Sequence, residues 1–351
     1  MASSVSSSPS LFTGLEFLGL GFVGLVTTLY VGNAEFSWLR GGDFIFSPFE
    51  FSNFVMSHLV ATQPSTVIYR NVVMISLSLF NCLYLELNRN ILKHANPIYL
   101  VLFPLLCFAF GPSTTLPFVT YYVCQCYEKV TVADFGNVHK TNEVRFERTF
   151  YVAVMNVFVV IFAVYLIPVS ATRYGPVAMV EKDYANILVL IPVGLSLMTT
   201  MDVYVFARIR QHVTLDESQS DIPPEVIAHY LSMCLHIMSL VVGLVVHVHS
   251  WAVIFTYESL WKFWEAAVIN PTTALFVFNY AIIFSTCYLW LDGFSTSLLG
   301  PKYYKDGILG IKDMIPMFIL GPTFHFNLAM VTRENALLDI DSEKRIQRQN
   351  S

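Results

Sequence analysis

The sequence predicts an all-α fold, a polytopic transmembrane bundle of about eight helical spans (seven to nine) kinked at Gly-Pro sites. Three observations favour this fold. Of the 351 residues, 55% are hydrophobic and only 13% are charged, whereas soluble domains carry about 25% charged residues. The mean hydropathy is +0.58. The apolar residues gather in runs of about 20, the length at which a helix crosses a bilayer core of roughly 30 Å.

The chain starts with a serine-rich stretch, 1–10, that is predicted to be disordered. It lacks the basic start and small-residue cleavage site of a signal peptide, so we expect the first apolar run to be retained. The expected spans are 11–31, 66–88, 97–126, 149–170, 185–207, 226–250, 268–291 and 307–332. The residues from 333 to 351 are expected to form a polar, solvated tail. The whole chain, 1–351, is expected to be one integral membrane domain.

Two apolar runs contain Gly-Pro followed by hydroxyl residues, "FGPSTTL" at 110–116 and "LGPTF" at 320–324. Proline removes a backbone donor and clashes with the carbonyl four residues earlier. In lipid, the freed carbonyl needs a new partner, which a nearby hydroxyl can supply. The run 97–126 holds three prolines and is either one kinked span or a re-entrant pair. The shared pattern hints that 66–129 and 268–334 are a duplicated unit, although Gly and Pro are common in membrane helices anyway.

The aromatic stretch "WAVIFTYESLWKFWEAAV" (251–268) is expected to be an interfacial helix or a membrane-level loop, because Trp and Tyr favour the headgroup zone. The Lys and Arg residues are balanced between the two sets of loops, so the sequence does not indicate the orientation in the membrane.

Four ionisable residues are candidates for catalysis, because polar groups inside spans are costly. Asp202 lies about 9 Å inside Arg208 along a helix, where its charged form is disfavoured. It would then be a neutral acid that can donate a proton, unless it pairs with Arg70 or Arg208. Asp292 is an alternative acid or a helix cap, and Glu86 is an alternative acid or a partner of Arg89.

The fourth candidate, His236, shares one helix face with His229 and His247 and would orient a carboxyl group or accept a proton. If all runs cross once, the polar residues divide between the two sides of the membrane. Arg70, Asp202, His229 and Asp292 then lie on one side, and Glu16, Glu86, His247, His249 and Glu334 on the other. Histidine-box spacings are missing, and the six cysteines have no CxxC spacing and are expected to pack as small apolar residues. No metal site and no cofactor are therefore expected.

Aromatic side chains are abundant, with 29 Phe, 18 Tyr and 5 Trp. Their faces stabilise cations without trapping them as a nucleophile would. The candidates for a substrate-binding role are Phe110, Phe324, Phe326, Tyr288 and Trp290. Plain packing is the alternative for each.

The sequence resembles the fungal membrane-bound terpene cyclases of meroterpenoid pathways, of the ascofuranone, ascochlorin and macrophorin type. The residues that carry the resemblance are "FGPSTTL" (110–116), "LGPTFHFNLAMVTREN" (320–335) and the isolated acids Glu86, Asp202 and Asp292. The resemblance implies a lyase or isomerase of secondary metabolism in the endoplasmic reticulum. Such an enzyme protonates and cyclises a farnesyl-type, epoxidised prenyl chain of a meroterpenoid intermediate. The Asp-rich DDxxD, NxxxDxxxD and DxDD boxes are absent, so diphosphate ionisation is not expected.

The expected partners are therefore a prenylated small molecule and the lipid bilayer. No basic block suggests nucleic acid. Three other functions are kept as alternatives: a multi-pass transporter or channel, a receptor or non-catalytic subunit of a biosynthetic pathway, and another membrane enzyme such as a sterol-isomerase-like protein. Broken helices and repeats favour the first of these.

Overall fold

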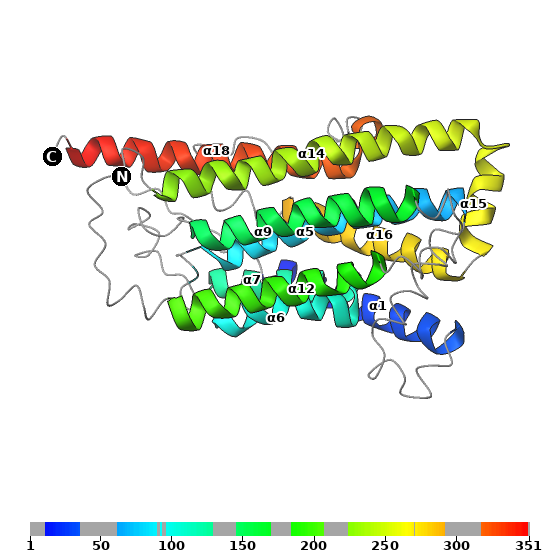
Figure 1. Ribbon diagram of the computed structural model, residues 1–351, viewed down its shortest axis with the longest axis horizontal. Coiled ribbons are helices and arrows are strands. Elements are labelled where there is room, and N and C mark those ends of the chain that lie inside the picture. Colours follow the sequence, from blue (N-terminus) through cyan, green and yellow to red (C-terminus); the bar gives the residue numbers. More distant parts are fainter. Residues whose placement is uncertain are drawn as a thin grey trace.

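The protein is a bundle of helices, seen here in a computed structural model. The structure describes residues 11–35, 62–89, 92, 96–128, 145–169, 184–206, 224–269, 271–291 and 317–349. The helices in chain order are α1 (Leu11–Glu35), α5 (Gln63–Leu87), α6 (Pro97–Phe110), α7 (Pro112–Glu128), α9 (Phe146–Val159), η3 (Val160–Leu166), α12 (Tyr184–Met201), η4 (Asp202–Phe206), α14 (Pro224–Thr256), α15 (Leu260–Ile269), α16 (Pro271–Leu289) and α18 (Pro322–Gln349). The prediction of an all-α fold is confirmed for these residues (Figure 1).

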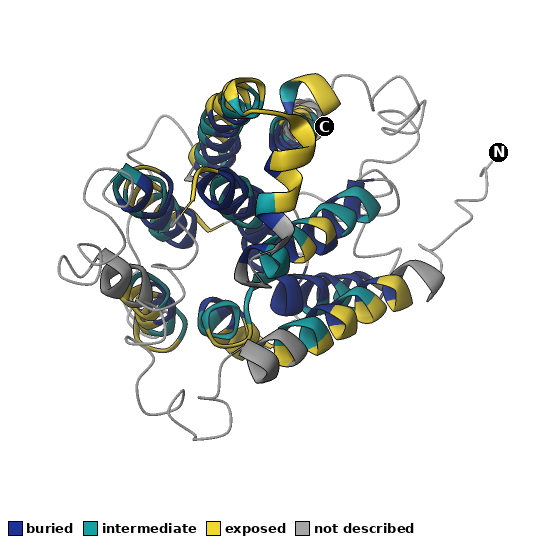
Figure 2. Cartoon of the chain, turned by 90° about the vertical axis from the view of Figure 1, so that its right-hand side faces the viewer, coloured by how far each residue is buried: buried dark blue, intermediate teal, exposed yellow. Residues whose placement is uncertain are grey.

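Three of the described helices are long and apolar enough to cross a membrane, namely Gln63–Leu87, Phe146–Val169 and Val226–Thr256. Shorter apolar helices cover Gly14–Leu29, Pro97–Phe110, Leu190–Val205 and Thr273–Leu289. Large apolar side chains stay exposed on the outer faces, as with Val245, which is 63% exposed, while the buried residues gather on the inward faces (Figure 2). This arrangement suggests a multi-pass membrane protein, since a bilayer covers apolar outer faces.

Helices α6 and α7 fold back on each other at Gly111. The rings of Tyr99 and Tyr122 lie 4.1 Å apart, and the Thr115 hydroxyl donates to the Leu106 carbonyl at 2.9 Å. Pairs this far apart in sequence meet only if the two helices are antiparallel. With 14 residues, α6 is about 21 Å long, less than the bilayer core. Of the two alternatives for 97–126, the described residues form the helical pair rather than one kinked span.

The α6–α7 hairpin is held by close packing of α1 against its tip. A Cβ atom placed on Gly24 would lie 2.4 Å from the Ser113 carbonyl oxygen, and one on Gly21 would lie 3.0 Å from the Phe118 ring. Glycine is therefore required at Gly24, where the neighbour is backbone, whereas a side chain at Gly21 would require the Phe118 ring to shift. Ser113 and Thr114 are buried beneath this contact, so the hydroxyl residues after the first Gly-Pro break face the protein interior, whereas Gly111 itself borders open space.

The hairpin changes which polar residues share an end of the bundle. Glu86 of α5 contacts Arg333 of α18, and Ser65 of α5 contacts Thr273 of α16. Helices α5, α16 and α18 therefore run in the same direction. His229, at the start of α14, contacts Glu334, so α14 runs in the opposite direction to α18. Glu86 and Glu334 share an end of the bundle, as predicted, but His229 lies with them rather than on the opposite side. The prediction for His229 was wrong because it assumed that every apolar run crosses once.

The polar tail predicted from residue 333 onward was also wrong at its start. Helix α18 continues through it to Gln349. Arg333 and Glu334 are 4% and 2% exposed, and Leu337 is 1% exposed. These residues are buried because they pack against the end of α5 and the start of α14. The predicted disordered stretch 1–10 lies outside the described residues.

Candidate functional site

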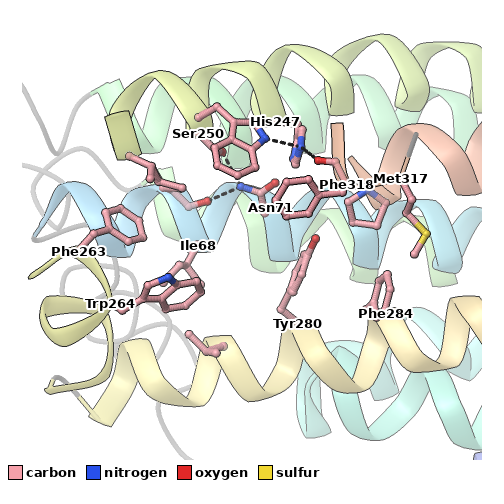
Figure 3. Close-up of a pocket in the computed structure, with 15 residues that line it drawn as sticks. Ile68, Asn71, His247, Ser250, Phe263, Trp264, Tyr280, Phe284, Met317 and Phe318 are labelled. Carbon is pink, nitrogen blue, oxygen red and sulfur yellow. Dashed lines mark hydrogen bonds between the residues drawn. The ribbon is translucent and has the colours of Figure 1, made fainter. Parts of the chain in front are cut away.

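An apolar cavity of about 450 Å³ lies between α5, α14, α15, α16 and the residues that lead into α18. We call it the aromatic cavity, because its wall includes Trp251, Phe263, Trp264, Tyr280, Phe284 and Phe318 (Figure 3). Ligand cavities in proteins have volumes of roughly 300–1,000 Å³. No Asp, Glu, Lys or Arg occurs among the described residues of its wall. The cavity can therefore hold an apolar molecule, and its ring faces can stabilise a positive charge on that molecule.

Helix α15 closes one end of the aromatic cavity. It runs across the end of the bundle (Figure 1). Of the two alternatives for the aromatic stretch 251–268, a helix or a loop, residues 260–268 therefore form a helix. Phe263 faces inward and is 1% exposed, whereas Trp261 on the outer side is 77% exposed. Trp264 and Phe318 line the cavity while remaining 44% and 67% exposed. The cavity thus opens to the outer face of the bundle at these two rings.

The second Gly-Pro break forms part of the cavity wall. Gly321 has a φ of 93°, and its carbonyl accepts a hydrogen bond from the His325 amide at 3.2 Å. Pro322 lines the cavity. The first break at Gly111 has the same construction, with a φ of 78° and a bond from the Thr115 amide of 3.1 Å. It does not line the aromatic cavity, so only one of the two breaks serves it.

His247 lies on the cavity wall beside the second break. The indole N–H of Trp251 points at its Nε2 at 2.9 Å, and the same nitrogen lies 3.1 Å from the Phe318 carbonyl oxygen. An indole is only a donor and a carbonyl only an acceptor. Nε2 therefore serves one partner at a time, as an acceptor from Trp251 or as a donor to Phe318. This nitrogen can take up or release a proton at the wall.

Three further polar side chains reach the cavity: Asn71 and Ser250 from α5 and α14, and Tyr280 from α16 (Figure 3). The Asn71 amide nitrogen donates to Ser250 Oγ at 2.7 Å, which ties α5 to α14. Polar groups in such small number fix the orientation of an apolar ligand rather than its affinity.

The acids predicted as proton donors lie elsewhere. Glu86 accepts hydrogen bonds from Arg89 at 2.8 Å, from Arg333 at 2.6 Å and from the Tyr127 hydroxyl at 2.5 Å. Arg89 also pairs with Glu334. We call these five residues the charged cluster. Two arginines balance its two carboxylates, so Glu86 is matched to bases, as in the alternative considered for it.

Glu334 receives a further contact from His229 Nδ1 at 3.2 Å. Burial by itself raises the pKa of the Glu334 carboxyl, but the Arg89 guanidinium and the His229 contact outweigh it and hold that pKa well below its usual range. The carboxyl group is therefore ionised.

Asp202 begins the π-helical turn η4 and is fully buried. It accepts a hydrogen bond from Arg148 Nε at 2.6 Å, and Arg148 also donates to the Asn88 side chain at 3.0 Å. The Asp202 carboxyl group thus has an ion-pair partner inside the bundle and does not line the aromatic cavity. The ion pair was foreseen as an alternative, but with Arg70 or Arg208 as the partner. Arg70 instead donates to the Val164 carbonyl at 3.1 Å.

His236 is buried within the bundle. Its Nδ1 lies 3.0 Å from Asn327 Oδ1, and the Asn327 amide donates to Ser78 at 2.8 Å and to the Thr323 carbonyl at 2.8 Å. The last bond fixes which atom of the amide is nitrogen, so His236 donates from Nδ1. His236 therefore orients an amide rather than a carboxyl group, and it does not line the aromatic cavity.

The predicted aromatic residues are distributed over several places. Phe326 and Tyr288 line a smaller hollow that shares Phe284, Met317 and Pro322 with the aromatic cavity. Trp290 is fully buried in the core, and Phe110 is 51% exposed at the hairpin tip. Phe324 is half-buried and lines neither hollow. Asp292 lies outside the described residues.

Sequence reasoning missed most of the aromatic cavity wall. Trp251, Phe263 and Trp264 come from the stretch 251–268, whose aromatic content was noted but assigned to the membrane surface. That density of rings was the signal that could have located the cavity.

Comparisons with protein-family models, with curated proteins and with solved structures found no match to this chain.

Proposed function

We propose that this chain is a multi-pass protein of the endoplasmic reticulum membrane, with seven to nine spans when the α6–α7 hairpin is counted as one. We further propose that it is a terpene cyclase acting on the prenyl chain of a meroterpenoid intermediate. The aromatic cavity is the observation that supports this proposal most directly. It offers a folded isoprenoid an apolar space with ring faces toward a developing cation, and its described wall has no Lys or Arg to bind a diphosphate.

The proposed reaction is an isomerisation. An acid gives a proton to the epoxide oxygen or to a terminal alkene carbon of the prenyl chain. For the epoxide, the C–O bond breaks and its electron pair stays on oxygen. An alkene electron pair then forms a carbon–carbon bond to the cationic carbon. A base finally removes one proton from carbon, so the product has the composition of the substrate.

The base is assigned by its place on the cavity wall, and the acid is the predicted acid that remains when the two others are set aside. Glu86 and Asp202 are matched to arginines away from the cavity. Asp292 stays a prediction, and it directly follows Leu291, which lines the smaller hollow. We therefore propose Asp292 as the acid and His247, whose Nε2 can accept a proton at the wall, as the base. General acid catalysis contributes about 10²–10⁴-fold, so chain folding and exclusion of water must supply much of the rest.

The proposal is tested by incubating purified protein in lipid nanodiscs with an epoxyfarnesyl phenol. We expect a cyclic isomer of unchanged mass by liquid chromatography and mass spectrometry. Val277→Trp, which fills the cavity, should abolish the product. Val245→Trp makes the same change at a side chain on the outer face that is 63% exposed and should leave the rate unchanged.

Acid variants refine the test. Asp292→Asn should abolish cyclisation, whereas Asp202→Asn should retain it in whatever fraction of the protein folds. The proposed reaction is wrong if the wild-type protein yields no isomer from either the epoxide or the corresponding alkene.

Transport is a second candidate function, because half-membrane helices such as α6 and α7 occur in transporters. One side of the hairpin tip is covered by α1, however, where a Cβ on Gly24 would meet Ser113. Uptake of a labelled prenyl phenol into sealed proteoliposomes, without chemical change, would favour transport over cyclisation.

A further inference from the structure

We propose that Asn71 and Tyr280 together hold the one oxygen atom of the ligand inside the aromatic cavity, and that this oxygen belongs to a neutral hydroxyl or to the epoxide from which it forms. This inference rests on the proposed function, since it names the chemistry of the ligand for the same cavity. It follows from which hydrogen-bonding atoms the cavity wall leaves open.

The amide of Asn71 has a fixed orientation. One atom of the amide faces the Val67 carbonyl at 2.8 Å, and a carbonyl is only an acceptor, so this atom is Nδ2. Nδ2 also faces Ser250 Oγ at 2.7 Å. The Ser250 hydroxyl gives its own proton to the Val246 carbonyl at 2.7 Å, so it accepts from Asn71. Both amide protons are thus committed.

Asn71 Oδ1 consequently remains an acceptor with no hydrogen-bond partner among the described residues. The residue lines the cavity. A ligand group that donates a proton to this oxygen is therefore the natural complement.

Tyr280 supplies the complementary donor from the opposite wall. It rises from α16, and its hydroxyl points across the cavity toward α5 and α14 (Figure 3). Its ring packs on Phe284 with centroids 6.4 Å apart, and within the described part of the chain its hydroxyl has no hydrogen-bond partner. A phenol donates one hydrogen bond and accepts others.

One acceptor and one donor facing the same space match a hydroxyl group, which both donates and accepts. An epoxide oxygen only accepts, so it can bind Tyr280 alone. When the epoxide opens, its oxygen carries the new proton and can donate it to Asn71. The pair therefore gains a second hydrogen bond as the epoxide oxygen becomes a hydroxyl group. To the extent that this bond forms during ring opening, it stabilises the transition state more than the substrate.

A phosphate or carboxylate finds no Lys or Arg among the described residues of the wall, and burying such a charge without a permanent counter-charge is costly. The structure therefore assigns the cavity to neutral, oxygen-bearing isoprenoids rather than to prenyl phosphates.

The experiment uses three probes with one carbon skeleton: farnesol, which donates and accepts, farnesyl methyl ether, which only accepts, and the hydrocarbon farnesene. Binding to the full chain in nanodiscs is followed by quenching of Trp251 and Trp264, which line the cavity. Wild-type protein should prefer farnesol to the ether and the ether to farnesene, each by about 2- to 12-fold in Kd. Farnesyl phosphate should bind more weakly than farnesol.

Each variant should abolish one of the two differences in Kd, either that between farnesol and the ether or that between the ether and farnesene. Asn71→Leu should bind farnesol and the ether equally, and Tyr280→Phe should bind the ether and farnesene equally. Tyr69→Phe is the matched control, because Tyr69 is a buried α5 residue that does not line the cavity, and it should keep both differences. The ratio of two Kd values measured on the same variant cancels any general loss of affinity from a changed cavity shape, because the probes share one carbon skeleton.

The inference is overturned if the ratios survive in both variants, or if farnesyl phosphate binds more tightly than farnesol. These outcomes are distinct from failure of the proposed function. If both variants keep the wild-type Kd ratios while the wild-type protein isomerises the epoxide, only the oxygen site is refuted. If each variant loses its expected Kd difference but the wild-type protein isomerises nothing, only the cyclase reaction is refuted.

Discussion

The α-carbon of Gly321 lies directly against the imidazole ring of His247, so that a Cβ atom on Gly321 would stand 2.7 Å from His247 Cγ. This close approach places the start of α18 beside α14 and sets the position of His247 on the cavity wall. Glycine is favoured at the two Gly-Pro breaks for two separate reasons. Both glycines have a positive φ, but only at Gly321 does a neighbouring side chain leave no room for a Cβ atom.

The two breaks allow these two reasons to be tested separately. Gly111→Ala should cost about 1–3 kcal/mol of stability from backbone strain, because its φ of 78° and ψ of 156° form a conformation that only glycine adopts readily. Steric contact adds nothing, since no atom lies within 4 Å of its Cβ position. Gly321→Ala should cost more and should also weaken binding in the aromatic cavity, because His247 must move. Thermal unfolding in detergent and probe affinity measure the two effects. Equal losses of stability would show that the contact with His247 is unimportant.

The packing of α1 on the hairpin leads to a second prediction. Gly24→Ala places a methyl group 2.4 Å from the Ser113 carbonyl oxygen and should destabilise the protein by about 1–3 kcal/mol. Gly19→Ala, on the same helix with nothing within 4 Å, should be neutral or gain up to about 1 kcal/mol from helix propensity. Unfolding of the two variants side by side gives the comparison. A neutral Gly24→Ala would contradict the described contact between α1 and α7.

The buried ion pair of Arg148 and Asp202 leads to a third prediction. Arg148→Met should cost about 3–5 kcal/mol, because it leaves the Asp202 carboxylate without its guanidinium partner in the interior. Adding Asp202→Asn removes that charge and should restore part of the loss. A double-mutant cycle on unfolding measures the coupling, which should be about 0.5–3 kcal/mol. Strictly additive effects would mean that the pair does not interact.

A pH dependence follows from Glu334, whose pKa is held below its usual range in the folded protein. A group with a depressed folded pKa contributes stability that is present above its unfolded pKa, about 4.3, and lost as the pH falls toward the folded value. Stability should thus be insensitive to this group between pH 7 and about 5 and should fall below about pH 4. Melting temperatures across this range measure the effect.

Glu334→Gln should lower stability at pH 7 and flatten the acid limb of the curve. Glu258→Gln is the control, since Glu258 pairs with Lys262 in an exposed bridge, with side chains 72% and 61% exposed, and should change little. An acid limb that persists unchanged in Glu334→Gln would assign it to other carboxyl groups.

The sequence was sufficient for the helical class and for both Gly-Pro breaks, because these depend on local composition and on proline geometry. It was insufficient for the ion pairs. Asp202 meets Arg148, a residue 54 positions earlier in the chain, and no local pattern indicates such a partner. The division of residues between the two sides failed for a related reason. The helix pair that turns back at Gly111 reverses the direction of α9, α12, α14 and α16, whereas α18 runs parallel to α5 as single crossings would have it. The turn at Gly111 depends on tertiary packing against α1.

The same turn at Gly111 has a consequence for where the two ends of the chain emerge. The first turns of α1 pack beside the last turns of α7, where Gly14 meets Tyr121 and Gln125. Tyr127 of α7 contacts Glu86, which in turn contacts Arg333 near the middle of α18. Reporters fused before α1 and after α18 should accordingly be accessible from one and the same compartment, whichever compartment that is.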